Sequence, residues 1–212
     1  MESFIADVMS GVTDIEAFIT RFCRDAQFRE EVDLLLPREA IGNREHEIWR
    51  RYSYDAYAAC GFSCSKHICE LCKFDHSIGD NLNIFSIVQV LFSYRYPNIF
   101  CTTKYIDLHD LYLDVVKDCF DGPEVSPLVN EIICSAASRP TKTARKRIAY
   151  ELIKSSFHID GNIRPRWIQG PEWPMGVKSP MKYINKKSNG EEVRFEFVDV
   201  DTGIKRIVIQ YY

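Results

Sequence analysis

The amino-acid sequence predicts an α+β fold, with an N-terminal multi-helix body and a C-terminal three-stranded antiparallel β-meander packed on it. Apolar residues recur at helical spacing through most of residues 3–157 and then alternate at a period of two from residue 181 onward. Between these regions, prolines and glycines in 164–176 (RPRWIQGPEWPMG) exclude a continuous helix. We therefore expect a helical body at 1–163 and a corner followed by the meander at 164–212, together forming one compact unit.

The helical body is expected to contain about seven helices, and local capping signals mark several of their starts. Thr13 and Glu16 have the spacing of a capping box, and Asp25 can cap the helix that follows it. The segment Leu82–Tyr94 is apolar nearly all round, which is typical of a helix in the middle of a bundle.

The last part of the body carries three further helix signals. The segment Tyr105–Phe120 is strongly amphipathic and predicts one long helix. Ser126 is followed by a proline that suits the first helical turn, so a second helix should start there. Thr141 or Thr143 opens the last helix, which is expected to end at about Phe157.

Three strands are predicted after the corner, separated by short turn signals. They cover Met181–Lys186, Glu192–Val200 and Ile204–Tyr212. Asn-Gly at 189–190 and Asp-Thr-Gly at 201–203 are typical of tight turns, which favours an antiparallel meander. Two apolar rows alternate along the second and third strands: Val193, Phe195 and Phe197, and Ile207, Ile209 and Tyr211. Such a small sheet needs another surface to cover its apolar face, and the helices are expected to provide it.

The corner contains Trp167 and Trp173, which admit two interpretations. Each indole offers a large apolar face and one N–H donor. In the first interpretation the two side chains are core residues that pin the sheet to the helices. In the second they form an exposed aromatic loop that binds a partner.

Composition places the chain among globular proteins of a reducing compartment. It has 46% hydrophobic and 13% aromatic residues, enough for a substantial core. Its eight cysteines occur without a secretory signal, which favours free thiols over a disulfide framework. No apolar run approaches the length of a membrane span, so no membrane association and a cytoplasmic location are expected.

Charge is distributed unevenly along the chain. Residues 1–138 hold 22 acidic and 12 basic residues, whereas residues 139–212 hold 8 and 15. The basic run lies at the start of the second part and consists of Arg139, Lys142, Arg145, Lys146 and Arg147. It lacks an obvious aromatic stacking platform, so nucleic-acid binding is not favoured; a solvated face, or pairing with the chain's own acids, is the preferred interpretation.

Metal and catalytic motifs are weak. Cys60, Cys64, Cys69 and Cys72 suggest a zinc site. If this segment is a helix, however, Cys64 and Cys72 would lie about 12 Å apart along its axis, too far to bind one ion. We therefore expect no metal. No HExxH, GxSxG, phosphate-loop or dinucleotide motif is present, and the histidines at 46, 67, 76, 109 and 158 are scattered. No catalytic residue is assigned and no cofactor is expected.

One acidic pattern is unusual. The spacing of Asp107, Asp110, Asp114, Asp118 and Asp121 would align all five carboxylates along one stripe of a helix. Like charges at these spacings repel, and the last two sit where the helix dipole disfavours acids. The stripe is therefore expected to face a partner protein or the chain's own basic run at 139–147, or simply to be solvated, and the sequence leaves these alternatives open.

Three segments carry a family resemblance: CKFDHSIGDNLNIF, RPRWIQGPEWPMGVKSPMKYI and FEFVDVDTGIKRIVIQYY. The chain resembles a family of small uncharacterised bacterial proteins with a W-I-Q-x-P-E-W-P corner and a β-meander, and the likeness covers most of its length. Those proteins look like immunity proteins of bacterial toxin–immunity systems. The resemblance implies a non-catalytic binding protein that blocks the active or entry surface of a cognate toxin. The alternative is a hydrolase or nucleic-acid-processing enzyme with an unrecognised active site; the position of the gene beside a toxin gene would distinguish the two.

Overall fold

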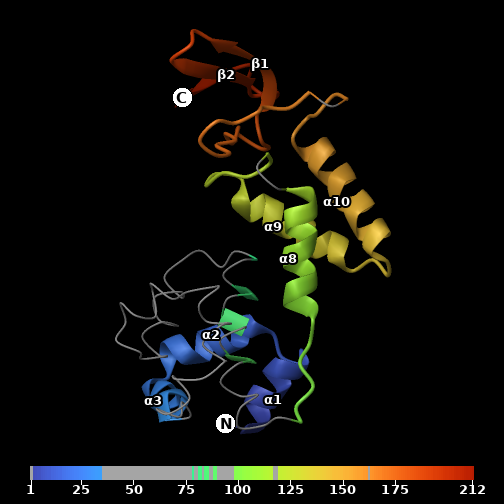
Figure 1. The fold of residues 1–212 in the computed structure, drawn as a ribbon, viewed down its shortest axis with the longest axis vertical. Helices are drawn as coiled ribbons and strands as arrows, with labels where there is room; N and C mark the ends of the chain where they lie inside the picture. The colour runs from blue at the N-terminus through green and yellow to red at the C-terminus, as the bar shows by residue number, and fades with distance from the viewer. Residues whose placement is uncertain are drawn as a thin grey trace. The chain divides into compact units, whose positions relative to one another are not determined.

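A computed structural model describes residues 2–34, 78, 81–82, 84–85, 88–89, 98–116, 119–161 and 163–212 of the chain. Its helices within these ranges are α1 (Glu2–Ser10), α2 (Ile15–Arg24), α3 (Ala26–Leu34), α8 (Lys104–Val115), α9 (Ser126–Ala137) and α10 (Lys142–Ser156). The strands β1 (Lys182–Ser188), β2 (Glu192–Val198) and β3 (Lys205–Tyr211) form one antiparallel sheet (Figure 1). The predicted α+β class, with helices first and a three-stranded meander last, is confirmed.

The chain divides into two compact units, Met1–Ile106 and Asp107–Tyr212, and each is described by itself. The boundary expected from the sequence, between residues 163 and 164, lies inside the second unit. There the later helices, the corner and the sheet share one core. None of the helices that the structure describes is both long and apolar enough to cross a membrane.

The first unit is built around a cluster of aromatic side chains. Phe18 of α2 stacks on Phe22 and meets the edge of Phe28 from α3, with ring centroids 5.8 and 5.6 Å apart. The Tyr105 hydroxyl lies 2.6 Å from the backbone N–H of Ile15, from which it accepts a hydrogen bond at the start of α2. Burial raises the pKa of Tyr105 to about 12, so this phenol stays neutral and can hold the helix start.

The capping box predicted at the start of α2 is wrong. Asp14 is the N-cap residue and makes no side-chain capping hydrogen bond, so Thr13 lies one residue too early to cap the helix. Glu16 does not reach back to the cap either, because its carboxylate accepts a hydrogen bond from Asn81 at 2.6 Å. A long-range contact has therefore replaced the local one.

Three further predicted helix starts, those of α3, α9 and α10, are confirmed, while most of the predicted helix Leu82–Tyr94 lies outside the described residues. The Asp25 carboxylate accepts from the N–H of Phe28 at 3.0 Å, which caps α3. Pro127 occupies the first turn of α9, as expected for a residue without an N–H. The first of the two candidate threonines, Thr141, caps α10 by accepting from the N–H of Ala144 at 3.2 Å.

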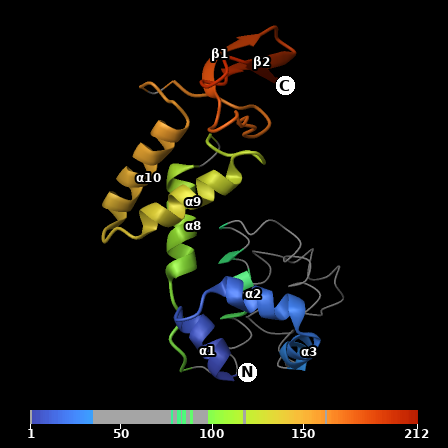
Figure 2. The ribbon, with the colours of Figure 1, turned by 180° about the vertical axis from the view of Figure 1, so that it is seen from behind.

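In the second unit, α8 ends at Val115, earlier than the predicted end at Phe120. The departure from the helix lets Phe120 enter the core. Its ring lies 5.7 Å from Phe157 and 5.8 Å from Trp173, measured between centroids. The following helices α9 and α10 pack against each other, as both ribbon views show (Figure 2).

The sheet buries the face of β2 that the sequence predicted. Val193, Phe195 and Phe197 are all buried. Trp167 and Trp173 cover them from the corner: the Trp167 ring lies 4.8 Å from Phe195, and the Trp173 ring lies 5.5 Å from Phe197. The expectation that the sheet packs on the rest of the unit through both tryptophans is confirmed.

The apolar row expected on β3 faces outward instead. Phe195 pairs with Val208, so the even-numbered residues of β3 share the buried face and Ile207, Ile209 and Tyr211 are exposed. Pairing register decides the face, because neighbouring residues of a strand point to opposite sides. Here the turn between β2 and β3 sets the register.

That turn is held by the buried carboxylate of Asp199. It accepts hydrogen bonds from the N–H of Asp201 at 3.0 Å and the hydroxyl of Thr202 at 2.8 Å. It also accepts from the N–H of Val177, in the loop after the corner, at 3.3 Å. These hydrogen bonds lower the pKa of Asp199, the bond from Thr202 most of all. The carboxylate therefore stays ionised and fixes both the turn and the alignment of the strands.

Candidate functional site

Two acidic residues of α8, Asp107 and Asp114, face basic residues of α10. Lys146 lies 2.7 Å and Lys142 lies 3.6 Å from the Asp114 carboxylate. Arg145 lies 3.8 Å from Asp107. The hydrogen bond from Lys146 is the main reason that the pKa of Asp114 lies below its usual value. The geometry thus favours the internal-pairing interpretation for Asp107 and Asp114.

The remaining aspartates do not continue the stripe. Asp110 is exposed on α8, and Asp118 lies outside the described residues. Asp121 follows the end of α8, so the prediction that it lies on the same helical stripe is wrong. Its carboxylate instead accepts hydrogen bonds from the Tyr112 hydroxyl and from the N–H of Gly122, the latter at 2.8 Å.

The two corner tryptophans have structural partners. Trp173 is 1% exposed, and its indole N–H donates to the carbonyl of Met181 at 2.8 Å. Trp167 is half-buried and donates to the carbonyl of Cys119 at 3.0 Å. Trp173 therefore presents no surface to a partner, and the placement of both side chains agrees with the rigid-corner interpretation.

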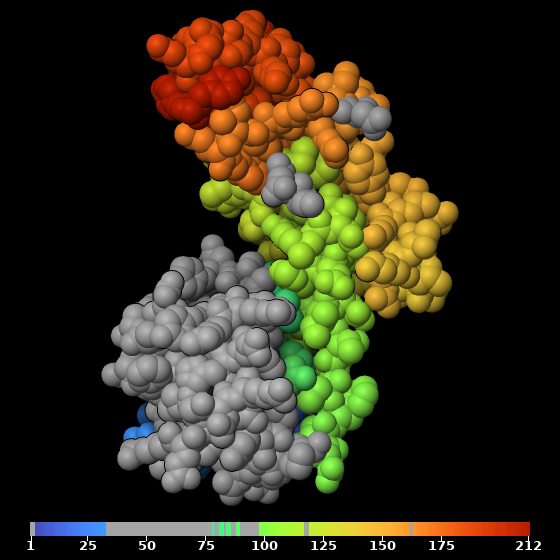
Figure 3. Space-filling view, viewed as in Figure 1, coloured from blue at the N-terminus to red at the C-terminus, as the bar shows by residue number. Residues whose placement is uncertain are grey.

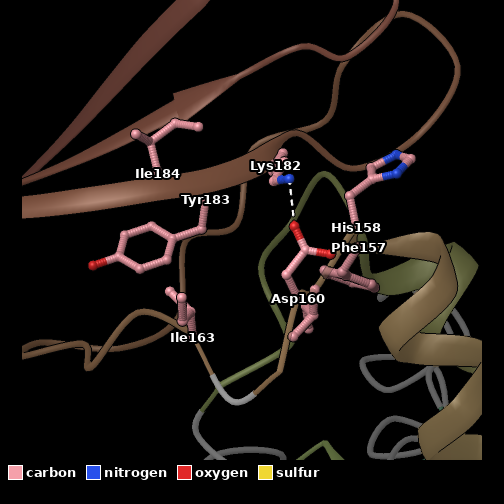
Figure 4. A pocket seen from close by; sticks show the side chains of 8 residues that line it. Phe157, His158, Asp160, Ile163, Lys182, Tyr183 and Ile184 are labelled. Carbon is pink, nitrogen blue, oxygen red and sulfur yellow. Dashed lines mark hydrogen bonds and ion pairs between the residues drawn. The ribbon is translucent and has the colours of Figure 1, made fainter.

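An open pocket of about 150 Å³ lies between the turn after α10 and strand β1 (Figure 4). Its lining residues are Phe157, His158, Ile159, Asp160, Ile163, Lys182, Tyr183 and Ile184. In Figure 4 the Tyr183 ring lies between Ile184 and Ile163, while Asp160 reaches up to Lys182. The pocket thus has an apolar side and a charged side.

The charged side of the pocket is an ion pair. Lys182 donates to Asp160 at 2.6 Å, and this hydrogen bond lowers the pKa of Asp160. The Asp160 side chain is 79% exposed, whereas that of Lys182 is 37% exposed. On the other side, burial raises the pKa of Tyr183. The accessible charge of the pocket is therefore the carboxylate at its rim.

His158 makes a contact that a hydrolase would need. It lies just after α10 with a φ of 52°, a left-handed conformation in which histidine is enriched among non-glycine residues. Its Nε2 lies 2.8 Å from Oγ of Ser179. A working nucleophile–base pair also needs a group that orients the base. Among the described side chains no contact to Nδ1 of His158 is present, and Figure 4 shows the imidazole turned away from the pocket. The contact therefore acts as a loop tether.

The described residues form no metal-binding cluster. Across the described ranges, no three His, Cys, Asp or Glu side chains gather as ion ligands would. The cysteines at 60, 64, 69 and 72 lie outside these ranges, so the expectation that they bind no zinc stays a prediction.

No protein family, curated protein or solved structure matches this chain.

The pocket could not be predicted from the sequence, because its two sides come from separate segments, 157–163 and 182–184. Asp160 followed by glycine predicts a turn, but nothing in the sequence pairs that turn with β1.

Proposed function

We propose that this chain is a non-catalytic protein-binding protein, acting in the cytoplasm as an immunity-type inhibitor of a cognate bacterial toxin domain. The observation that carries the proposal is the pocket between α10 and β1. Sites for small-molecule ligands usually enclose about 300–1,000 Å³. A volume of about 150 Å³ fits one protein side chain better than a substrate or cofactor.

The lining suits a basic side chain of the toxin. Asp160 offers an accessible carboxylate at the rim. Ile163 and Ile184 are 61% and 43% exposed and offer apolar contact below it. Arginine and lysine bury an apolar stem while keeping the charged end near water. A cationic anchor would therefore pair with Asp160 and rest its stem on the two isoleucines.

The resemblance to immunity proteins supplies the class of partner. An inhibitor of this kind needs no catalytic group, since it works by occupying the active or entry surface of the toxin. Binding energy in such interfaces is concentrated in a few anchors that fill pockets. Two of the described cysteines, Cys23 and Cys101, are free thiols, which suits a reducing compartment.

The proposal is tested by co-expressing the full chain with the toxin encoded next to it and measuring binding by calorimetry. Ile163→Lys should weaken the complex at least about tenfold, because it removes an apolar contact and places a cation where the basic anchor would lie. Asp160→Asn should weaken it less and should also reduce the dependence of the association rate on salt.

Val177→Lys is the matched control, since Val177 is 68% exposed in a loop that does not line the pocket. It should change binding less than about twofold. If no neighbouring toxin binds the wild-type chain, or if Ile163→Lys binds as tightly as the control, the proposal is wrong.

The alternative, a hydrolase, is favoured by one observation, the contact between His158 and Ser179. An activated serine would react with a fluorophosphonate probe, and Ser179→Ala would abolish that labelling. The binding proposal predicts no labelling at Ser179 and an unchanged affinity for the toxin in the Ser179→Ala variant. Labelling at Ser179 together with ester hydrolysis would establish the alternative.

A further inference from the structure

Strand β3 carries its polar and apolar residues on unexpected faces. Ile207, Ile209 and Tyr211 are 52%, 40% and 55% exposed, whereas Gln210 is fully buried. The Gln210 amide accepts from the N–H of Ile168 at 2.8 Å and donates to the carbonyl of Gly170 at 2.6 Å. The buried polar residue is thus satisfied by the corner, and the apolar row is left facing solvent.

The same strand has an open backbone edge. The sheet order is β1-β2-β3, so one side of β3 has no neighbouring strand in the described part of the chain. Hydrogen bonds link Asp199 N–H to the Ile204 carbonyl and Tyr212 N–H to the Glu191 carbonyl, at 2.9 and 3.2 Å. In an antiparallel ladder, alternate residues bond to the same neighbour. The even-numbered residues of β3 therefore bond to β2, and the odd-numbered ones point their N–H and C=O groups to the open edge.

The two edges of this sheet differ in how well they are protected against pairing with a strand of another chain. Edge strands usually carry lysines, bulges or prolines that prevent association. At the β1 edge there are three lysines, at 182, 186 and 187, and the register shifts between Tyr183 and Asn185. At β3 the centre of the strand is Ile-Val-Ile, and its pairing with β2 is regular throughout. Figure 3 shows this C-terminal segment, in dark red, at the surface of the molecule. Only β3 combines an apolar row with an unprotected edge in this sheet.

We propose that β3 pairs antiparallel with β3 of a second copy of this chain, joining the two sheets into one continuous sheet. A two-fold axis beside Val208 places Ile207 opposite the partner's Ile209, and Lys205 opposite the partner's Tyr211. These four residues are the ones whose backbone groups point to the open edge, so this register completes the ladder along the whole strand.

The charge pattern of the strand favours a second copy over an unrelated strand. A two-fold interface must be complementary to itself. In the register described, Arg206 lies opposite the partner's Gln210, and Lys205 lies opposite an aromatic ring, so no like charges meet. Arg206 is also neutralised within its own chain by Glu124, at 2.6 Å. The two exposed isoleucine pairs become neighbours across the junction and shield each other from water.

The test measures the mass of the full chain by light scattering over about a hundredfold range of concentration, since dimers dissociate on dilution. The wild type should reach the mass of a dimer. Ile207→Lys combined with Ile209→Lys should remain a monomer with unchanged circular dichroism. Val177→Lys, an exposed apolar residue outside the sheet, is the matched control and should dimerise like the wild type. If the lysine variant loses its fold, Ile207→Thr with Ile209→Thr keeps the β-branched shape and should weaken the dimer.

Amide hydrogen exchange identifies the edge itself. In the dimer, the amides of Ile207 and Ile209 should exchange at least about tenfold more slowly than in the wild-type monomer at high dilution, because they become hydrogen-bonded. The amides of Val208 and Gln210, already bonded to β2, should change little. A chain that stays monomeric, or a dimer that persists in the double lysine variant, would overturn the proposal. Protection of Ile207 and Ile209 only after a different protein is added would overturn it too and assign the edge to that protein.

Discussion

Arg206 on β3 donates hydrogen bonds from both terminal guanidinium nitrogens to the carboxylate of Glu124, at 2.8 and 2.6 Å. The same carboxylate accepts from the N–H of Met175 in the corner, at 2.9 Å. One acidic side chain in the turn before α9 therefore joins the helices, the corner and the sheet of the second unit. The bidentate geometry makes this the strongest type of surface ion pair.

Glu124→Gln should lower the free energy of unfolding by about 1 kcal/mol at pH 7, a value limited by the partial exposure of both side chains. Arg206 lowers the pKa of Glu124 from 4.5. A lowered folded-state pKa stabilises the fold above the unfolded-state value, and that stability is lost as pH falls through the folded-state value. Denaturant unfolding at pH 7 and at about pH 3 should thus show a difference between variant and wild type that shrinks in acid. Glu131→Gln, on the exposed side of α9, is the control and should change the free energy of unfolding little at pH 7.

Gly122→Ala should destabilise the second unit more than Gly170→Ala. Both glycines have positive φ, 146° and 155°, so both changes carry a similar backbone strain. At Gly122 the added Cβ would also lie 2.8 Å from the backbone nitrogen of Trp173, whereas nothing lies within 4 Å at Gly170. The crowding should add about 1–3 kcal/mol to the loss at Gly122. Equal losses for the two variants, measured by thermal unfolding, would contradict the close approach of the corner to Gly122.

Replacing each corner tryptophan with phenylalanine should separate their roles. Trp173→Phe leaves the buried carbonyl of Met181 without its donor and should cost about 1–3 kcal/mol. Trp167→Phe removes a donor from Cys119 at a half-buried site, where water can replace it, and should cost less. Denaturant unfolding of both variants measures the difference. A larger loss for Trp167→Phe would mean that the half-buried tryptophan, rather than the buried one, holds the corner.

Local signals in the sequence were reliable where local hydrogen bonds decide the structure. Asp25 and Thr141 cap their helices because the acceptor lies three residues before the N–H that it binds. The face of β3 could not be predicted in this way. It depends on the turn held by Asp199, which also binds the N–H of Val177 from another loop. Alternation alone gives two faces and does not say which one is buried.

The candidate site was harder to predict for the same reason. The ion pair of Asp160 with Lys182 joins residues that are far apart in the sequence, and no spacing rule connects a turn after a helix to an edge strand. The aspartate stripe was visible in the sequence, and its basic counterpart at 139–147 was visible too. The structure adds the pairing of α8 with α10 and the early end of α8, which removes Asp121 from the stripe.

Asp114→Asn should lower the melting temperature by about 1–3 °C, whereas Asp110→Asn should leave it unchanged or raise it slightly. Asp114 faces Lys146 and Lys142 on α10, and its loss leaves two cations without a counter-charge. Asp110 is exposed beside other acids, so its neutralisation only relieves repulsion. The lowered pKa of Asp114 gives stability above the unfolded-state value of 3.8, which is lost as pH falls through the folded-state value. The two variants should therefore melt alike in strong acid and also at high salt, where exposed ion pairs are screened. If Asp114→Asn melts like the wild type at neutral pH but associates more slowly with a toxin, the stripe binds a partner. The ion pairs with α10 would then contribute nothing to the stability of the fold.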